Sequence, residues 1–367
     1  MASTFIPTPP LRSFCKPKRL SAARRRPSRA GRQGRAVDDG RRGRPVSVNG
    51  VMPVKPKVLI PTDTWNAEGG RSPQQILQLA RMAEQSGLDG IFTGDHVTFY
   101  GVGNDALMNL HAVAAVTERL MLMSCVYLLP LRHPTPVALQ CAMLDQMSGG
   151  RLVLGVGIGG EDPNEFWACG VDPATRGART NESMQILRSL WTQDETTFRG
   201  KHFSIENVRM RPRPVSDGGV PMIVGGRSDA ALKRAGRYGD GWIGIWNSPR
   251  RMAEARERVR EFATEAGRPD HPFQFGLQVW CSVDDDEAKA RERVSRRMEG
   301  FYKLPFESFE RYVPYGSAEK VAEFLAAHVE AGCGQFNLVL VQESGQDIVE
   351  AGLQIKESLA THGRKPS

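Results

Sequence analysis

The sequence predicts an α/β fold, a closed barrel of eight parallel β-strands each followed by an α-helix, with a strand-containing insertion between strands 4 and 5. Three observations lead to this prediction. From Lys57 onwards short apolar runs alternate with amphipathic helical patterns, and strands separated by helices form parallel βαβ units. About eight such units occupy roughly 300 residues, a typical length for a (β/α)8 barrel. A longer stretch, Thr196–Arg211, interrupts the alternation with strand-like residues such as Phe198 and Ile205.

The first four units are marked by helix caps and glycine stops. Ser72 precedes a proline at the first helical position, and Gly87 stands where a C-cap glycine ends a helix. Gly149 and Gly150 end the third helix in the same way. The predicted strands are Val58–Pro61, Leu88–Thr93, Leu120–Leu129 and Leu152–Gly155, and the predicted helices are Gln74–Gln85, Asp105–Glu118, Pro136–Met147 and Asn181–Trp191.

The remaining units continue the alternation. The run Asp284-Asp285-Asp286 opens a helix, where acidic residues favour the helix dipole. No further ligands follow at calcium-loop spacing, so we interpret the run as a cap and expect no metal site. We expect Phe301–Pro314 to be irregular. The predicted strands are Met222–Val224, Gly241–Ile245, Phe275–Val283 and Gln335–Val341, and the helices are Ser228–Arg237, Arg250–Ala266, Asp284–Arg297, Ala318–Ala331 and Asp347–Leu359.

The positive charge of the chain is concentrated at its N-terminus. The 367 residues carry a net charge of +8, but residues 1–50 hold thirteen Lys and Arg against two Asp and Glu. The rest holds 36 basic and 39 acidic residues and is mildly acidic. We therefore expect no nucleic-acid partner for the barrel itself. The sequence contains no run of about 18 apolar residues, so we expect no membrane-spanning helix.

Residues 1–51 are predicted to form a disordered basic tail, and residues 52–367 the barrel. Three interpretations of the tail remain open. It is an extended start before Met52, an organellar transit peptide rich in arginine and serine, or an arm that binds nucleic acid or anionic lipid. The six cysteines are scattered without a CxxC pair, and no secretory h-region is present. These features favour reduced thiols and a cytoplasmic location.

Because chemistry in such barrels occurs at the carboxyl ends of the strands, the residues that follow each strand are the candidates. Asp95 and His96 follow the second strand. They are suited to proton transfer or to hydrogen-bonding a cofactor ring, but they are equally suited to capping the strand end. The fourth strand leads into Gly155-Val156-Gly157-Ile158-Gly159-Gly160-Glu161, whose glycines would let backbone amides approach a ligand.

The fifth strand ends in Gly225-Gly226-Arg227-Ser228, where a helix begins. Free N–H groups at a helix N-terminus, a serine hydroxyl and an arginine together predict a phosphate site. A serine N-cap behind turn glycines would explain Ser228 but neither the glycine pair nor Arg227.

Two longer blocks of sequence carry a resemblance to known proteins. The first runs from Arg132-His133-Pro134 through Leu144-Asp145-Gln146-Met147-Ser148-Gly149-Gly150-Arg151 into the glycine-rich segment. The second is Pro221–Ser228 followed by Arg237-Tyr238-Gly239-Asp240-Gly241-Trp242. Together the blocks resemble the bacterial-luciferase-like family of flavin-dependent oxidoreductases, and the resemblance covers nearly all of residues 57–360. It implies a TIM-type barrel that binds a flavin-like cofactor, with coenzyme F420 favoured over FMN.

The resemblance also implies roles for individual residues. Asp95 and His96 would lie beside the cofactor ring, Glu161 would be a second catalytic acid, and Tyr100 and Trp65 would border the substrate pocket. A non-proline cis peptide is expected at the end of strand three, here Ser124-Cys125. The residues implied to bind the cofactor are Ser124, Cys125, Gly157, Gly159, Asn164, Gly225, Gly226, Arg227 and Ser228.

The predicted function is hydride transfer between F420 and a small organic substrate. The alternative is an FMN-dependent monooxygenase that uses reduced flavin and O₂. A hypothesis of a different class is a non-catalytic flavin-binding protein tethered to nucleic acid by its basic tail. The resemblance further implies a homo-oligomer, most simply a dimer.

Overall fold

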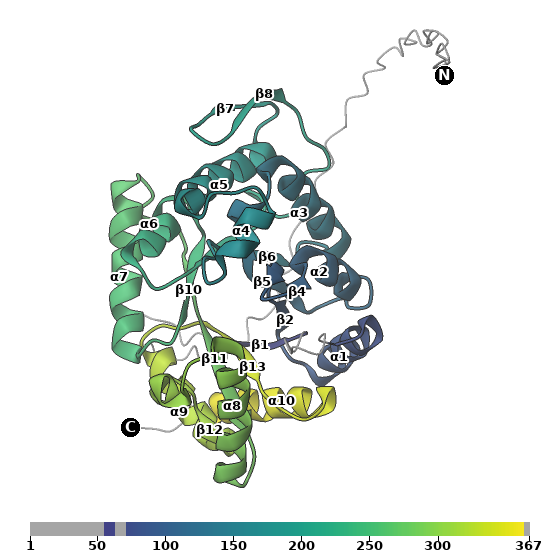
Figure 1. Cartoon of the computed structure of the whole chain (residues 1–367), viewed down its shortest axis with the longest axis vertical. Helices are drawn as coiled ribbons and strands as arrows, with labels where there is room; N and C mark the ends of the chain where they lie inside the picture. The colour runs from purple at the N-terminus through teal and green to yellow at the C-terminus, as the bar shows by residue number, and fades with distance from the viewer. Residues whose placement is uncertain (1–54, 63–70, 363–367) are drawn as a thin grey trace, which may run out of the picture. The chain divides into compact units, whose positions relative to one another are not determined.

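The computed structural model describes residues 55–62 and 71–362, and eight of its strands close into a parallel barrel (Figure 1). Neighbouring strands pair in the order in which they follow one another along the chain, and β13 pairs back to β1. The predicted architecture is confirmed. The barrel strands are β1 (Lys57–Pro61), β2 (Gly90–Thr93), β5 (Met121–Leu128), β6 (Leu152–Gly157), β9 (Met222–Gly225), β10 (Gly241–Ile245), β11 (Gln274–Val283) and β13 (Gln335–Leu340).

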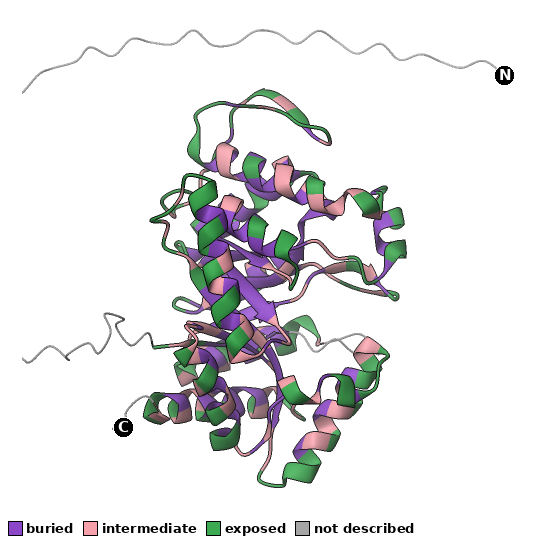
Figure 2. Cartoon of the chain, turned by 90° about the vertical axis from the view of Figure 1, so that its left-hand side faces the viewer, coloured by how far each residue is buried: buried purple, intermediate pink, exposed green. Residues whose placement is uncertain are grey.

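Helices surround this barrel, and their outer faces carry the exposed residues (Figure 2). The predicted caps of the first helix form, because Ser72 and Gln75 make a reciprocal capping box and Gly87 adopts the left-handed conformation with φ of 84°. The helices are α1 (Pro73–Ser86), α2 (Ala106–Ala114), α3 (Pro134–Ser148), α4 (Pro163–Ala168), α5 (Arg176–Thr192), α6 (Asp229–Tyr238), α7 (Pro249–Glu265), α8 (Glu287–Tyr302), α9 (Ala318–Glu330) and α10 (Gly345–His362).

Short elements occupy the connections. The predicted insertion between the fourth and fifth barrel strands is an antiparallel hairpin of β7 (Thr196–Arg199) and β8 (Ser204–Val208). A second hairpin, β3 (His96–Phe99) with β4 (Val102–Asn104), follows β2 and was not predicted. The others are β12 (Tyr315–Gly316), which pairs with the end of β11, and the 3-10 turns Leu129–Leu131, Pro173–Thr175, Phe306–Ser308 and Glu310–Tyr312.

Three predicted boundaries were wrong by several residues. The helix predicted to run to Glu118 ends at Ala114, and the helix predicted from Asn181 begins at Arg176. The helix predicted to stop at Arg297 continues to Tyr302, so the segment expected to be irregular begins later. Its start agrees with the prediction of a cap, because Asp286 accepts the N–H groups of Ala288 and Lys289.

The interior of the barrel is filled by apolar side chains. Leu59, Phe92, Met123, Val153 and Ile243, from five different strands, form one buried cluster inside it. A larger cluster packs between the strands and the helices. Since the barrel is a packed core and not a pore, a ligand must bind at one of its ends.

Residues 1–54, with the predicted tail, lie outside the described residues, as does Trp65. None of the helices in residues 55–62 and 71–362 combines the length and the hydropathy that crossing a membrane requires. In the same residues no cluster of three or more His, Cys, Asp or Glu side chains is placed to hold a metal ion.

Candidate active site

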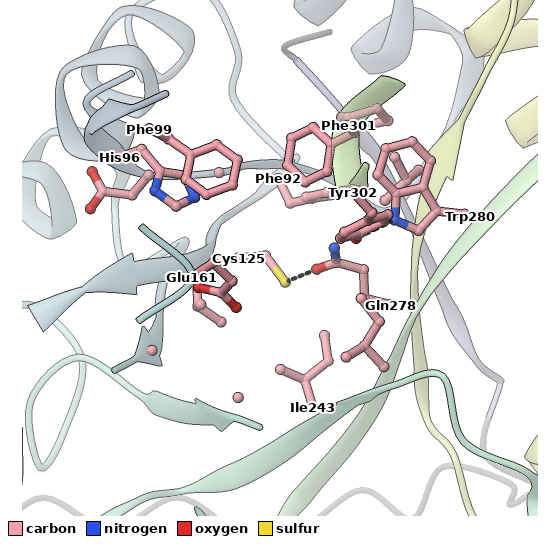
Figure 3. Close-up of a pocket in the computed structure, with 18 of the residues that line it drawn as sticks. Phe92, His96, Phe99, Cys125, Glu161, Ile243, Gln278, Trp280, Phe301 and Tyr302 are labelled. Carbon is pink, nitrogen blue, oxygen red and sulfur yellow. Dashed lines mark hydrogen bonds between the residues drawn. The ribbon is translucent and has the colours of Figure 1, made fainter. Parts of the chain in front are cut away.

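A cavity of about 820 Å³ opens at the carboxyl ends of the barrel strands. Its lining includes Gly157 in β6 and Gly225 in β9. Phe92 at the end of β2, Cys125 in β5 and Gln278 in β11 also line it (Figure 3). Cavities that hold cofactors and their substrates typically measure about 300 to 1,000 Å³. The cavity therefore has the position and the size expected of an active site in such a barrel.

One corner of the pocket is lined by His96 at the start of β3, which Glu165 in α4 holds in place. The Nδ1 atom of His96 lies 3.0 Å from Oε2 of Glu165, whose side chain is almost completely buried. The N–H of Val97 donates to Oε1 of the same carboxylate at 2.6 Å. Burial by itself raises the pKa of Glu165. The hydrogen bond and charge of His96, together with the backbone donors, lower the pKa by more than burial raises it, so the net shift is downward. Glu165 thus ties the β3–β4 hairpin to α4 and fixes the His96 ring.

Asp95 is held by Arg132 beneath this corner. Nη1 of Arg132 donates to Oδ2 of Asp95 at 2.6 Å and Nη2 donates to Oδ1 at 3.0 Å. The N–H groups of Leu128 and Ala106 also donate to this carboxylate. Burial raises the pKa of Asp95, and Arg132 and the backbone donors oppose that shift. The buried Asp95 carboxylate thus accepts four hydrogen bonds, and this geometry favours a structural role in which Asp95 holds its neighbours in place.

One end of the pocket is lined by glycine. A Cβ atom on Gly157 would lie 2.3 Å from the Val126 side chain, and one on Gly225 would lie 2.8 Å from it. Only glycine lets these strand ends pass Val126 with their backbones facing the cavity. The indole N–H of Trp242 donates to the carbonyl of Gly226 at 2.7 Å, so the two parts of the second sequence block support each other.

Arg227 supplies the positive charge at this glycine-lined end. Its side chain is exposed at the pocket, and its guanidinium lies 5.0 Å from the centre of the Trp246 ring. The next residue, Ser228, caps α6 through the N–H of Ala231, and α6 begins at Asp229. An anion here would meet an arginine and the N-terminus of a ten-residue helix.

Glu161 and Tyr100 border the mouth on the side of His96. The Tyr100 hydroxyl donates to the Glu161 carbonyl at 3.4 Å, and the Tyr100 N–H donates to Oδ2 of Asp162 at 3.0 Å. Tyr100 is 64% exposed, with a φ of 45° at the turn of the β3–β4 hairpin. Glu161 lines the cavity as well (Figure 3).

The end of β5 forms part of the floor. The thiol of Cys125 donates to Oε1 of Gln278 at 2.9 Å across the pocket (Figure 3). A non-proline cis peptide is present, but it joins Cys125 to Val126. The predicted position, Ser124-Cys125, was therefore wrong by one residue.

The remaining side of the pocket is aromatic. We define the aromatic wall as Phe99, Trp246, Trp280, Phe301 and Tyr302, all of which line the cavity. It is assembled from β3, from the segment after β10, from β11 and from the last turn of α8. None of these five residues was predicted to belong to the site.

The structure brings most of the predicted site residues to one cavity. Ten of them line it: Asp95, His96, Tyr100, Cys125, Gly157, Gly159, Glu161, Gly225, Gly226 and Arg227. Three others, Ser124, Asn164 and Ser228, do not line it. The Ser124 hydroxyl is buried and donates to the Gly155 carbonyl, and Asn164 is exposed on α4. The Ser228 hydroxyl accepts the Ala231 N–H as the N-cap of α6. Their predicted contacts with a cofactor stay predictions, as does the role of Trp65.

Sequence reasoning missed Glu165, Arg132 and the aromatic wall for identifiable reasons. Glu165 follows Asn164 in the motif, but only the hairpin contact distinguishes it from an ordinary acid in a first helical turn. Gln278 and Trp280 alternate along β11, and this spacing was the available signal that both face the same side.

The comparisons with known proteins agree with this geometry. The family model for luciferase-like monooxygenases matches residues 54–351. An uncharacterised protein of Mycobacterium tuberculosis is 38% identical over 164 residues, which are 45% of this chain and 55% of that protein. An F420-dependent glucose-6-phosphate dehydrogenase of Kineococcus radiotolerans is 32% identical over 235 residues, which are 61% of this chain and 68% of that enzyme. This chain thus spans little more than half the length of the mycobacterial relative.

A solved structure shares the fold. It is the FMN complex of the oxygenating constituent of 3,6-diketocamphane monooxygenase from Pseudomonas putida, with a TM-score of 0.68. The match covers 84% of this chain and 98% of that one at 20% sequence identity. Together with the family match over most of the sequence, the barrel and its strand-end pocket lead to one conclusion: the chain belongs to the luciferase-like monooxygenase family.

Proposed function

We propose that this protein is an oxidoreductase that uses coenzyme F420 to transfer hydride to or from a small organic substrate. The observation that carries the proposal is the arrangement of the pocket, in which a glycine-lined end with Arg227 and a corner with His96 and Glu161 belong to one cavity. The similarity to an F420-dependent glucose-6-phosphate dehydrogenase over 61% of the chain supports the choice of cofactor.

The residues present fit a phosphorylated ring cofactor. Gly157 and Gly225 expose backbone where a Cβ atom would collide with Val126, and Arg227 offers the charge for a phosphate. We assign the phosphate end to Gly225, Gly226 and Arg227, and the ring to the region between Cys125 and His96. When bound, the deazaflavin ring supplies the hydride chemistry.

The chain's own groups would orient the reactants and move a proton. Glu165 fixes His96 through Nδ1, so we assign proton handling to Nε2 of His96, with the Glu161 carboxylate as the second acid–base group. The aromatic wall excludes water from the reacting region. Asp95 and Arg132 hold the strand ends on which these groups stand.

A titration tests the cofactor assignment. The purified full-length protein is titrated with F420 and with FMN, and binding is followed by cofactor fluorescence. We expect F420 to bind and Arg227→Ala to weaken binding by about tenfold, the usual effect of losing one charge-assisted hydrogen bond. Arg250→Ala, a change at an exposed arginine outside the pocket, is the matched control and should leave binding unchanged. If neither cofactor binds, the proposal is wrong.

The second candidate function is an FMN-dependent monooxygenase. The name of the family and the FMN complex of a protein with the same fold support it. Binding of FMN alone, with O₂ consumption that depends on reduced flavin, would favour this function over the first.

We also propose that two copies associate, that the protein acts in the cytoplasm, and that residues 1–51 form a separate basic tail. If the tail carried the activity, as in the nucleic-acid hypothesis, its deletion would abolish function. The enzyme proposal expects the full chain and a variant lacking residues 1–51 to bind cofactor equally well.

A further inference from the structure

The aromatic wall is a continuous surface on one side of the pocket. The ring centres of Phe99 and Phe301 lie 5.5 Å apart, those of Phe301 and Tyr302 4.8 Å apart, and those of Tyr302 and Trp246 4.9 Å apart. Trp280 lies 5.8 Å from both Phe301 and Tyr302. Figure 3 shows Phe99, Phe301, Tyr302 and Trp280 along the same side of the cavity. Contacts of this kind fix the rings against one another and give a rigid apolar face.

The Tyr302 hydroxyl is a polar group within this surface, and the buried indole N–H of Trp246 is another. The indole N–H of Trp280 donates to that oxygen at 3.1 Å. Within residues 55–62 and 71–362, no group accepts a hydrogen bond from the Tyr302 hydroxyl. This hydroxyl can therefore donate a hydrogen bond to a ligand. Burial raises the pKa of Tyr302, and the hydrogen bond from Trp280 opposes that shift. The phenol therefore stays neutral and remains a donor at ordinary pH.

The wall is poorly suited to a charged or heavily hydroxylated molecule. Hydroxyl groups pressed against five aromatic rings would lose their hydrogen bonds to water, at a cost of about 1 to 3 kcal/mol for each unpaired group. Two arginines, Arg71 and Arg297, also line the cavity, but both already have interaction partners within the chain. The guanidinium of Arg227 lies at the glycine-lined end and 5.0 Å from the centre of the Trp246 ring, so it stands at the border of the wall. The proposed function assigns its charge to the phosphate of the cofactor.

We propose that the substrate is an uncharged, flat and largely apolar compound with one carbonyl or hydroxyl oxygen, and that Tyr302 donates a hydrogen bond to that oxygen. This inference rests on the proposed function, because it takes the glycine-lined end to be occupied by the cofactor. It makes Tyr302 a residue that determines specificity, and it separates this protein from a sugar-phosphate dehydrogenase.

A comparison of four probes tests the inference. The full-length protein, with and without F420, is titrated with acetophenone, 1-phenylethanol, ethylbenzene and glucose 6-phosphate, and binding is followed by tryptophan fluorescence and calorimetry. We expect acetophenone and 1-phenylethanol to bind about three- to tenfold more tightly than ethylbenzene, which has the same ring but no oxygen. Glucose 6-phosphate should bind more weakly than any of them.

Tyr302→Phe should remove the preference for an oxygen and leave the affinity for ethylbenzene unchanged. Tyr312→Phe, outside the pocket, is the matched control and should keep the preference. Phe301→Leu, at a half-buried position, should weaken the binding of ethylbenzene and of acetophenone to the same extent. This variant tests whether the aromatic wall binds the substrate even if Tyr302→Phe does not fold.

Preferential binding of glucose 6-phosphate would overturn the inference, and so would a preference for acetophenone that survives in Tyr302→Phe. Ketone binding that persists while neither F420 nor FMN binds would instead overturn the proposed function. The two failures are therefore distinguishable.

Discussion

Glu165 positions the His96 ring in the pocket and also stabilises the β3–β4 hairpin that carries His96. Its carboxylate accepts hydrogen bonds from the His96 ring and from the N–H groups of Val97 and Thr98. Its pKa is lowered in the folded protein, so the ionised form stabilises the fold above the unfolded pKa of about 4.3. That stabilisation is lost as the pH falls through the lower folded value.

Replacing Glu165 should therefore change the acid side of the stability profile. We expect Glu165→Gln to lower the free energy of unfolding by about 1.5 to 3 kcal/mol at pH 7, because hydrogen bonds to an ionised group are lost. The melting temperature of the variant should also fall less steeply than that of the wild type below pH 4.5. The profile is measured from pH 3 to 7, with Glu161→Gln as the control. Parallel acid limbs in wild type and Glu165→Gln would contradict the assignment.

The Asp95–Arg132 pair should be the most sensitive ion pair near the site. Asp95 has a side chain that is 0% exposed, so Arg132→Ala leaves a buried charge without its partner. We expect a loss of about 3 to 5 kcal/mol in the free energy of unfolding. Arg119→Ala, which breaks an ion pair with Glu84 at a side chain that is 71% exposed, should cost less than about 1 kcal/mol. Urea denaturation compares the two, and similar losses would refute the distinction.

At the scale of elements, α8 has a stabilising N-cap at its first turn and two residues of the aromatic wall in its last turn. Asp286 caps its first turn, and Phe301 and Tyr302 stand in its last. Loss of the cap should loosen a helix whose far end lines the pocket.

We expect Asp286→Ala to cost about 1 kcal/mol of stability and to lower the melting temperature by a few degrees. Asp285→Ala is the matched control, because Asp285 is an exposed neighbour that does not cap the helix. Thermal denaturation by circular dichroism checks both. An equal effect of the two substitutions would show that charge near the helix end, and not the cap, is responsible.

The elements that the sequence did not reveal lacked a local signal. The end of α8 was missed because no glycine marks it: the C-cap residue is Lys303, which adopts the left-handed conformation in which glycine is usual. The β3–β4 hairpin depends on contacts from Asp162 and Glu165, which are more than 60 residues away in the chain. The barrel itself was predictable because alternating strands and helices leave few other topologies. In the same way, motif glycines indicated the glycine-lined end of the cavity, whereas the aromatic wall is assembled from distant segments.

At the scale of the whole molecule, an exposed apolar surface on α2 and α3 supports the proposed association of two copies. Met143 and Met147 are 51% and 56% exposed and lie one helical turn apart on α3, and Met108 on the neighbouring α2 is 73% exposed. Exposed methionines one turn apart on a helix form an apolar strip of a kind used in protein–protein contacts.

We expect light scattering to give the mass of a dimer for the wild type. The double variant Met143→Glu and Met147→Glu should give the mass of a monomer, because two carboxylates cannot be buried at a symmetric contact without partners. Leu304→Glu, a substitution at another exposed apolar residue outside these helices, should remain dimeric. A monomeric wild type would disprove the association.

The two ends of the pocket come from different stretches of the chain. The glycine-lined end is built between Gly157 and Arg227, whereas Trp280 lies in β11 and Phe301 and Tyr302 end α8. Two parts encoded separately can be inherited separately. Recombination between relatives could exchange the β11–α8 segment, and with it the choice of substrate, while the descendant kept its ancestor's cofactor. A fold arranged in this way can diversify its reactions without having to evolve a new cofactor site each time.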